Sequence, residues 1–157
     1  AEVTRTAVGD VNVAAEIKQN GGDFGGEPSN NWIFPDETLC PDGVLAGAKV
    51  CALTSERSLR DRIDDLPPRY VRRGNFDVAE ERKEAVMQGV ADCAKNEFGE
   101  FSTIDGVRVE VDGGWFLIRP SGTEPKVRVT VEGETEERAD SVYDEATSIL
   151  TEAMESG

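Results

Sequence analysis

The stretch LIRPSGTEPKVRVTVEG, residues 117–133, predicts two strands joined by a short polar turn. An apolar run over residues 115–119 ends at an arginine, and residues 126–131 alternate valine with polar side chains. Such alternation is typical of a strand with one buried face. Residues 120–125 contain two prolines, a glycine and two hydroxyl side chains, which suit a tight reversal of the chain. An antiparallel hairpin is therefore expected.

The neighbouring segments extend this hairpin into a larger sheet with a helix on one face. Residues 107–111 alternate apolar and charged side chains, and residues 112–114 can turn the chain, so we expect a three-stranded meander. Acidic residues from Glu134 onward favour the start of a helix. The apolar stripe of that helix consists of Ala139, Val142, Tyr143, Ala146, Ile149, Leu150, Ala153 and Met154. This stripe should pack on the valine face of residues 126–131.

The region before the meander predicts two helices with a strand between them. Residues 55–66 have apolar side chains at helical spacing, with Ser55 as the expected cap, and residues 69–76 are strand-like. Asp77 offers a capping-box-like start for the second helix. Residues 56–157 are therefore expected to form an α+β domain, an antiparallel sheet covered on one face by helices.

Residues 1–54 are expected to be part of a separate α/β domain. Residues 2–8 alternate well enough for a strand, residues 11–20 can form a short helix, and a second helix is expected from Asp42. The junction between the two domains is expected near residues 53–58. Because the sequence opens without methionine and directly on a strand-like segment, we expect it to be a piece of a longer polypeptide.

Charge and composition narrow the range of partners. The chain has 17 Lys and Arg against 32 Asp and Glu, a formal net charge of −15, so neither nucleic acid nor a membrane is expected as a partner. No apolar run approaches the roughly 20 residues that span a bilayer. The acid is spread along the chain, which favours the salt-rich cytoplasm of a halophilic archaeon, with an ordinary acidic cytoplasmic domain as the alternative.

The residue types present also limit the chemistry. No histidine occurs, which removes the Ser-His and Cys-His nucleophile systems and the commonest general base. The cysteines Cys40, Cys51 and Cys93 are isolated, so a zinc site of the usual kind is not expected. We expect reduced thiols, at least one of them buried, and neither a catalytic residue nor a metal ligand in this chain.

The turn at residues 120–125 and the arginines beside it carry groups that bind an oxyanion. The candidate phosphate-binding residues are Arg119, Ser121, Gly122, Thr123 and Arg128. Arginine offers a planar fork of donors, hydroxyl groups offer further donors, and glycine lets successive N–H groups form an anion-binding nest. The pattern predicts a pocket for a phosphate monoester dianion. The alternative is an ordinary hairpin turn in which Arg119 merely pairs with Glu124.

Three segments resemble a known family, in the right order along the chain. RPSGTEPKVRV at 119–129 resembles the phosphate-binding loop of the α-D-phosphohexomutases. FGGEPSNNWIF at 24–34 is similar to the sugar-binding loop of that family, and RTAVGD at 5–10 resembles the Thr-x-Val-Gly segment upstream of it. The Asp-Gly at 42–43 also matches. The resemblance therefore covers almost the whole chain.

This resemblance implies parts of two domains of a four-domain enzyme. Residues 1–54 correspond to the end of the third, sugar-binding α/β domain, and residues 56–157 to the fourth domain, with a TATA-binding-protein-like fold. In this family a phosphoserine of the first domain exchanges phosphate with C1 and C6 of a hexose phosphate through a bisphosphate. The phosphoserine segment and the Mg²⁺ loop are absent from this sequence, so both are expected in the N-terminal domains of the same enzyme. The segment alone should bind neither cofactor and should be inactive.

The resemblance also implies which residues bind the sugar. Glu27 and Ser29 match the residues that hydrogen-bond the sugar hydroxyls. The family glycine after the serine is replaced by Asn30, the usual histidine by Asn31, and the residue before the serine is Pro28. These departures blur the sugar preference, so phosphomannomutase/phosphoglucomutase and phosphoglucosamine mutase remain alternatives. The alternative from another class is a stand-alone module that binds a phosphorylated ligand or a partner protein without catalysis.

Overall fold

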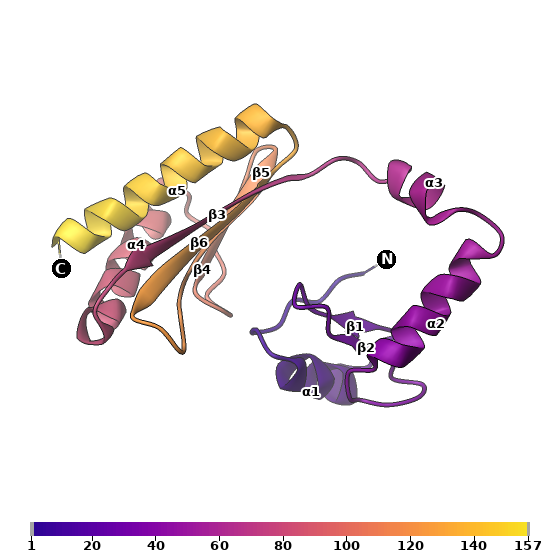
Figure 1. Cartoon of the computed structure of the whole chain (residues 1–157). Helices are drawn as coiled ribbons and strands as arrows, with labels where there is room; N and C mark the ends of the chain where they lie inside the picture. Colours follow the sequence, from indigo (N-terminus) through magenta and orange to yellow (C-terminus); the bar gives the residue numbers. More distant parts are fainter. Residues whose placement is uncertain (1, 157) are drawn as a thin grey trace. The chain divides into compact units, whose positions relative to one another are not determined.

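The computed structural model describes residues 2–156, which form two compact units (Figure 1). The units are Ala1–Leu66 and Pro67–Gly157. The junction expected near residues 53–58 lies inside the first unit. The short helix after this segment, residues 59–64, is hydrogen-bonded to the helix before it, residues 43–54. There Arg62 Nε donates to the carbonyl of Leu53 at 3.0 Å.

The first unit combines helices with a short hairpin. Its elements are α1 Asp10–Asn20, β1 Gly25–Gly26, β2 Trp32–Ile33, α2 Gly43–Thr54 and α3 Leu59–Asp64. Both expected helices are confirmed, and the Asp42 side chain caps α2 by accepting from the N–H of Leu45 at 2.8 Å. The expected strand over residues 2–8 is wrong, because none of these residues is in a strand. An alternating pattern forms a strand only where a partner edge takes up its backbone groups.

The cap predicted for α3 is also wrong. The Ser58 hydroxyl accepts from the N–H of Asp61 at 3.2 Å and begins the helix. Ser55 instead ends α2, where its hydroxyl donates to the carbonyl of Ala52 at 2.7 Å. Because α2 extends through Thr54, Ser55 is the C-cap residue of α2 and does not cap the next helix.

Close packing of α1 on the hairpin depends on a glycine. A Cβ at Gly25 would lie 2.6 Å from Cγ1 of Val13 and 2.7 Å from Cδ1 of Ile17. Ile33, paired with Gly25 across the hairpin, is buried. The absence of a side chain at Gly25 thus lets α1 support the hairpin whose loop carries Glu27 and the residues after it.

The second unit is an antiparallel sheet with helices on one face. Its elements are β3 Tyr70–Asp77, η1 Glu80–Arg82, α4 Lys83–Glu97, β4 Val107–Val111, β5 Gly114–Pro120, β6 Lys126–Gly133 and α5 Glu136–Ser156. The strand order is β3-β6-β5-β4, with every neighbouring pair antiparallel (Figure 1). The expected meander β4-β5-β6 is confirmed, and β3 joins its β6 edge. The predicted α+β class is likewise confirmed.

The core lies between the sheet and helices α4 and α5. Val127, Val129 and Val131 are fully buried, as predicted for one face of β6. The predicted stripe of α5 packs into the same core, with six residues buried and Tyr143 and Met154 partly buried. Full burial of one valine stabilises the fold by about 1.5–3 kcal/mol. The apolar face is therefore occupied, and the other face of the sheet is left for polar side chains.

The predicted capping box at Asp77 is wrong. Asp77 is the last residue of β3 and pairs with Lys126 of β6. The next N–H, that of Val78, donates to the carbonyl of Pro125 at 3.0 Å. The helical turn begins only at Glu80, after Ala79, which provides no side-chain cap. Strand pairing with β6 therefore overrides the local capping signal. It also joins the segment between β3 and η1 to the 120–125 turn by a hydrogen bond.

Candidate phosphate-binding turn and sugar-binding loop

Arg119 and Arg128 lie side by side on the polar face of the sheet. Arg119 of β5 and Arg128 of β6 are direct partners in the strand register. Their neighbours Ile118, Val127 and Val129 are buried, so the alternation of the strands turns both arginines away from the core. Like charges directly opposite each other on neighbouring strands are destabilising. An anion between the two guanidinium groups would remove that cost.

The acidic partners of the two arginines are unequal. Arg128 Nη2 donates to Glu124 Oε2 at 2.7 Å, whereas Arg119 Nη1 is 3.8 Å from Asp105 Oδ2. The second distance is too long for a hydrogen bond. The expected alternative, in which Arg119 pairs with Glu124, is therefore wrong: Glu124 is engaged by Arg128 and, at 3.3 Å, by Lys126. Arg119 is only loosely held, and its side chain is 26% exposed.

Two further observations describe the charges beside this pair of arginines. Hydrogen bonds from Arg128, and then from Lys126, hold the pKa of Glu124 below its ordinary value. Glu124 therefore stays ionised beside the arginines. The Nε atom of Arg128 is buried and has no hydrogen-bond partner among the described residues. A buried donor without an acceptor costs about 1–3 kcal/mol, and more for a charged group.

The backbone of the 120–125 turn is hydrogen-bonded at its ends, and the N–H groups in its middle have no acceptor among the described residues. The N–H of Ser121 donates to the carbonyl of Lys126 at 2.8 Å, and that of Lys126 to the carbonyl of Glu124 at 2.8 Å. Among residues 2–156, no acceptor is found for the N–H groups of residues 122–124. Successive unpaired N–H groups in a turn form the kind of concavity that binds anions.

The side chains of the turn differ in exposure. Ser121 is 4% exposed, whereas Gly122 and Thr123 are exposed. Gly122 was expected to permit a sharp bend, but it does not have a left-handed φ. A Cβ at Gly122 would meet nothing within 4 Å, so its contribution is open space above the turn. The structure thus brings Arg119, the turn and Arg128 together at one end of the β5–β6 hairpin.

Lys83 is a residue of this region that sequence reasoning missed. It is the first residue of α4, is 6% exposed, and donates from Nζ to the carbonyls of Ser121 and Glu124, both at 2.7 Å. A signal was available in the sequence. Lys83 precedes Val86 and Val90 at helical spacing on the buried face of α4, where a lysine is unexpected.

In the first unit, Glu27 is the centre of a small hydrogen-bond network. Its Oε1 accepts from the N–H of Gly9 at 2.8 Å, and its Oε2 accepts from Asn31 Nδ2 at 3.2 Å and from the Ser29 hydroxyl at 3.4 Å. Glu27 and Ser29, both predicted to bind sugar, are therefore in contact. The bond to Gly9 also joins the RTAVGD segment to this loop.

The unusual residues of this loop have a structural explanation. Asn30 has φ 69°, a left-handed conformation that suits glycine and that asparagine tolerates better than most residues. Its N–H donates to the carbonyl of Glu27 at 3.0 Å and closes the turn. Asn31, which stands where the resembled family usually has histidine, donates to the Glu27 carboxylate at 3.2 Å and orients it. The substitutions thus preserve the turn while removing any imidazole chemistry.

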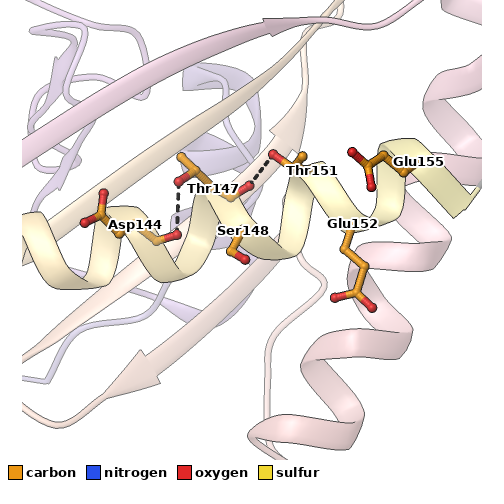
Figure 2. A pocket seen from close by; sticks show the side chains of 6 residues that line it. All are labelled: Asp144, Thr147, Ser148, Thr151, Glu152 and Glu155. Carbon is orange, nitrogen blue, oxygen red and sulfur yellow. Dashed lines mark hydrogen bonds between the residues drawn. The ribbon is translucent and has the colours of Figure 1, made fainter.

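The hollows on the surface lie away from these residues. Figure 2 shows one along α5, lined by Asp144, Thr147, Ser148, Thr151, Glu152 and Glu155. Its side chains are carboxylates and hydroxyls without a cation, and its threonines bond to the helix backbone, so a phosphate dianion would be repelled there. Among the described residues, no group of three metal-ligating side chains comes together. None of the described helices is long and apolar enough to cross a membrane.

Comparison with known proteins assigns the chain to a family. Residues 1–70 match the family model described as phosphoglucomutase/phosphomannomutase, alpha/beta/alpha domain III, and residues 75–148 match the C-terminal domain of the same family. The chain belongs to the phosphoglucomutase/phosphomannomutase family. The sequence-based resemblance is confirmed, including the order of the two domains along the chain.

Related members of this phosphohexomutase family come from archaea. The chain is 46% identical over 156 residues to a protein of Methanopyrus kandleri named "Probable phosphoglucosamine mutase", covering 98% of this chain and 34% of the relative. It is 47% identical over 152 residues to a protein of the same name from Methanococcoides burtonii, covering 97% of this chain and 34% of the relative. The chain thus spans about a third of the length of these curated relatives.

A solved structure shares the fold. The crystal structure of a phosphoglucomutase/phosphomannomutase family protein from Burkholderia thailandensis matches with a TM-score of 0.80 and 24% sequence identity. The match covers 95% of this chain and 32% of that one. The fold of a phosphohexomutase is therefore retained although most residues differ.

Proposed function

We propose that this chain supplies the sugar- and phosphate-binding portion of a phosphohexomutase that interconverts hexose 1-phosphate and hexose 6-phosphate. The paired arginines Arg119 and Arg128 carry the proposal, because two adjacent guanidinium groups on a chain of net charge −15 need a specific anion to explain them. The named relatives favour a hexosamine phosphate among the possible substrates. The rest of the enzyme would supply the phosphoserine and Mg²⁺ that the family resemblance implies.

In the second unit, the phosphate group is proposed to bind at the 120–125 turn. Arg128 already bonds Glu124, but its Nε has no acceptor among the described residues, and Arg119 has freedom to move onto the phosphate because its contact with Asp105 is long. The hydroxyls of Ser121 and Thr123 and the N–H groups of residues 122–124 supply further donors. The turn would thereby hold the phosphate that does not react.

In the first unit, Glu27 is proposed to accept hydrogen bonds from sugar hydroxyls. Its Oε1 is committed to Gly9 at 2.8 Å, whereas the contacts of Oε2 with Ser29 and Asn31 are longer, at 3.4 and 3.2 Å. The Oε2 atom therefore has capacity for a hydroxyl or an ammonium group of the substrate. Ser29 is proposed to add a second contact to the sugar.

The contribution of these two groups to the reaction is positioning. Each group would restrict the part of the substrate that it binds: the turn would hold the unreactive phosphate, and Glu27 would hold hydroxyls of the sugar. In the most favourable cases, correct orientation of the reactants lowers the activation free energy by about 7–11 kcal/mol. Arg119, Arg128 and Glu27 would each account for a share of it, without taking part in bond making.

The proposal is tested by NMR titration of the isotopically labelled chain. Glucosamine 6-phosphate should shift the amide signals of residues 122–124 and those around Glu27, whereas inorganic phosphate should shift only the former set. Glucosamine without phosphate serves as the matched control and should leave the turn unchanged. Shifts confined to other surfaces, such as the acidic hollow of α5, would refute the proposed function.

A further inference from the structure

Lys83 is buried behind the 120–125 turn, on the helix side of the hairpin. Its side chain is 7% exposed, and its Nζ atom donates to the carbonyls of Ser121 and Glu124, each at 2.7 Å. The third partner of the ammonium group is Glu80 Oε2 at 2.6 Å. All three donors of the ammonium group are therefore used, two of them on the backbone of a single turn.

The energetic cost of this lysine calls for an explanation. Burying a cation costs several kcal/mol unless hydrogen bonds compensate it. The equivalent positions one and two turns later, Val86 and Val90, are apolar and fully buried, so an apolar side chain would suit this face of α4. The acidic partner does not explain the burial either, because the side chain of Glu80 is 76% exposed. The interactions that compensate the burial are the two hydrogen bonds from the ammonium group to carbonyls of the turn.

This hold has a geometric consequence for the donors of the turn. A planar trans peptide directs its C=O and the following N–H to opposite sides, and the described chain has no cis peptide. Fixing the carbonyl of Ser121 toward Lys83 therefore directs the N–H of Gly122 away from the lysine. Fixing the carbonyl of Glu124 anchors the other end, so Gly122 and Thr123 lie between two held points. The carbonyl of Ser121, which accepts from this cation, is also polarised, and this strengthens the N–H of Gly122 as a donor. The carbonyl of Glu124 precedes Pro125, which has no N–H, so there the contact only anchors the chain.

We propose that Lys83 is a positioning residue of the phosphate-binding turn: it holds two carbonyls inward so that the intervening N–H groups are presented to an anion. This role rests on the proposed function of the turn. Lys83 touches no ligand in this arrangement and acts through Ser121 and Glu124. Its positive charge also reduces the electrostatic repulsion between the acidic chain and a dianion.

The test is a titration with inorganic phosphate of the labelled 157-residue chain and of three variants. Lys83→Met removes the charge and keeps the length of the side chain, and it should weaken phosphate binding at residues 122–124 by at least about tenfold. Lys83→Arg, which can still donate to carbonyls, should recover part of that loss. Lys95→Met, on the exposed side of the same helix, should bind as the wild type does. A folded Lys83→Met variant with wild-type affinity would overturn the role.

A second measurement on the wild type covers the case in which Lys83→Met does not fold. The buried ammonium protons of Lys83 should be visible by NMR, and saturating phosphate should shift them while leaving the side chain of Lys95 unchanged. An unperturbed Lys83 signal, with the turn amides shifted, would overturn the positioning role and leave the phosphate site intact. If phosphate shifts neither set in the wild type, the site itself is refuted, and the role of Lys83 with it.

Discussion

Arg119 and Arg128 are direct cross-strand partners on the polar face of a sheet whose other face is filled by valines. Glu124 bonds Arg128 at 2.7 Å, but the nearest carboxylate to Arg119 is Asp105 at 3.8 Å. The pair is thus incompletely neutralised, and Arg128 Nε has no acceptor among the described residues. This arrangement is unfavourable for the empty protein and favourable for an oxyanion complex.

The first prediction concerns Arg119. Arg119→Ala should weaken phosphate binding by at least about tenfold, since a charge-assisted hydrogen bond contributes about 1.5–3 kcal/mol. Stability without ligand should change little or rise slightly, because the substitution relieves repulsion with Arg128. Titration calorimetry and urea unfolding measure the two effects. Arg60→Ala, which removes an exposed charge from α3, is the control, and a large stability loss with unchanged affinity for Arg119→Ala would contradict the prediction.

The second prediction concerns the pH dependence of stability through Glu124. Its pKa in the folded state is lowered, so its contribution is fully present above the ordinary glutamate pKa and is lost as the pH falls through the folded-state value. Glu124→Gln should therefore be less stable than the wild type near neutral pH, with a difference that disappears in acid. Urea midpoints across the acid range measure it, with Glu56→Gln as an exposed control. A difference that does not depend on pH would be inconsistent with this account.

The third prediction concerns the reactivity of the thiols. Burial, and then the nearby charges of Glu152, Glu97 and Asp92, raise the pKa of Cys93, and its side chain is partly buried. Because the thiolate is the reactive form, Cys93 should be alkylated most slowly in the native chain at about pH 8.

Mass spectrometry of iodoacetamide-treated protein measures the three rates separately. Cys40 and Cys51, which are exposed, should react first, and the three rates should converge in urea. Equal rates in the native chain would show that the surroundings of Cys93 do not protect it.

The fourth prediction concerns the left-handed residue of the loop that carries Glu27. Asn30→Gly should leave stability nearly unchanged, because glycine adopts φ 69° without strain. Asn30→Val should destabilise the first unit by about 1–2 kcal/mol, the cost of a left-handed conformation for an ordinary residue. Thermal unfolding of the two variants measures the difference. Equal stability of Asn30→Gly and Asn30→Val would contradict the assigned conformation.

Local periodicity predicted much of the second unit. The alternation in residues 107–111 and 126–131 and the stripe of α5 each report on one buried face, and the structure contains each element. The errors arise where neighbouring or distant segments decided the outcome. At Asp77, pairing with β6 overrode the local capping pattern. Residues 2–8 alternate as a strand would, but they have no partner edge. At Ser55 the preceding helix extended further than the capping signal indicated.

The candidate site divides in the same way. Arg119, the turn and Arg128 are consecutive enough in the sequence that hairpin geometry alone places them together. Asp105 and Lys83 come from other parts of the chain, and their local sequence does not predict which residues they contact. Only packing of α4 against the sheet brings the Lys83 ammonium to the carbonyls of the turn.

The sequence by itself determined the family, the antiparallel hairpin and the arginines at its end, because side-chain alternation and turn chemistry act over a few neighbouring residues. The tertiary structure alone decided which carboxylate each arginine meets, which N–H groups of the turn stay unpaired, and that a buried lysine holds the turn from behind. These contacts depend on distances between segments far apart in the chain, and such distances are fixed only when the core closes.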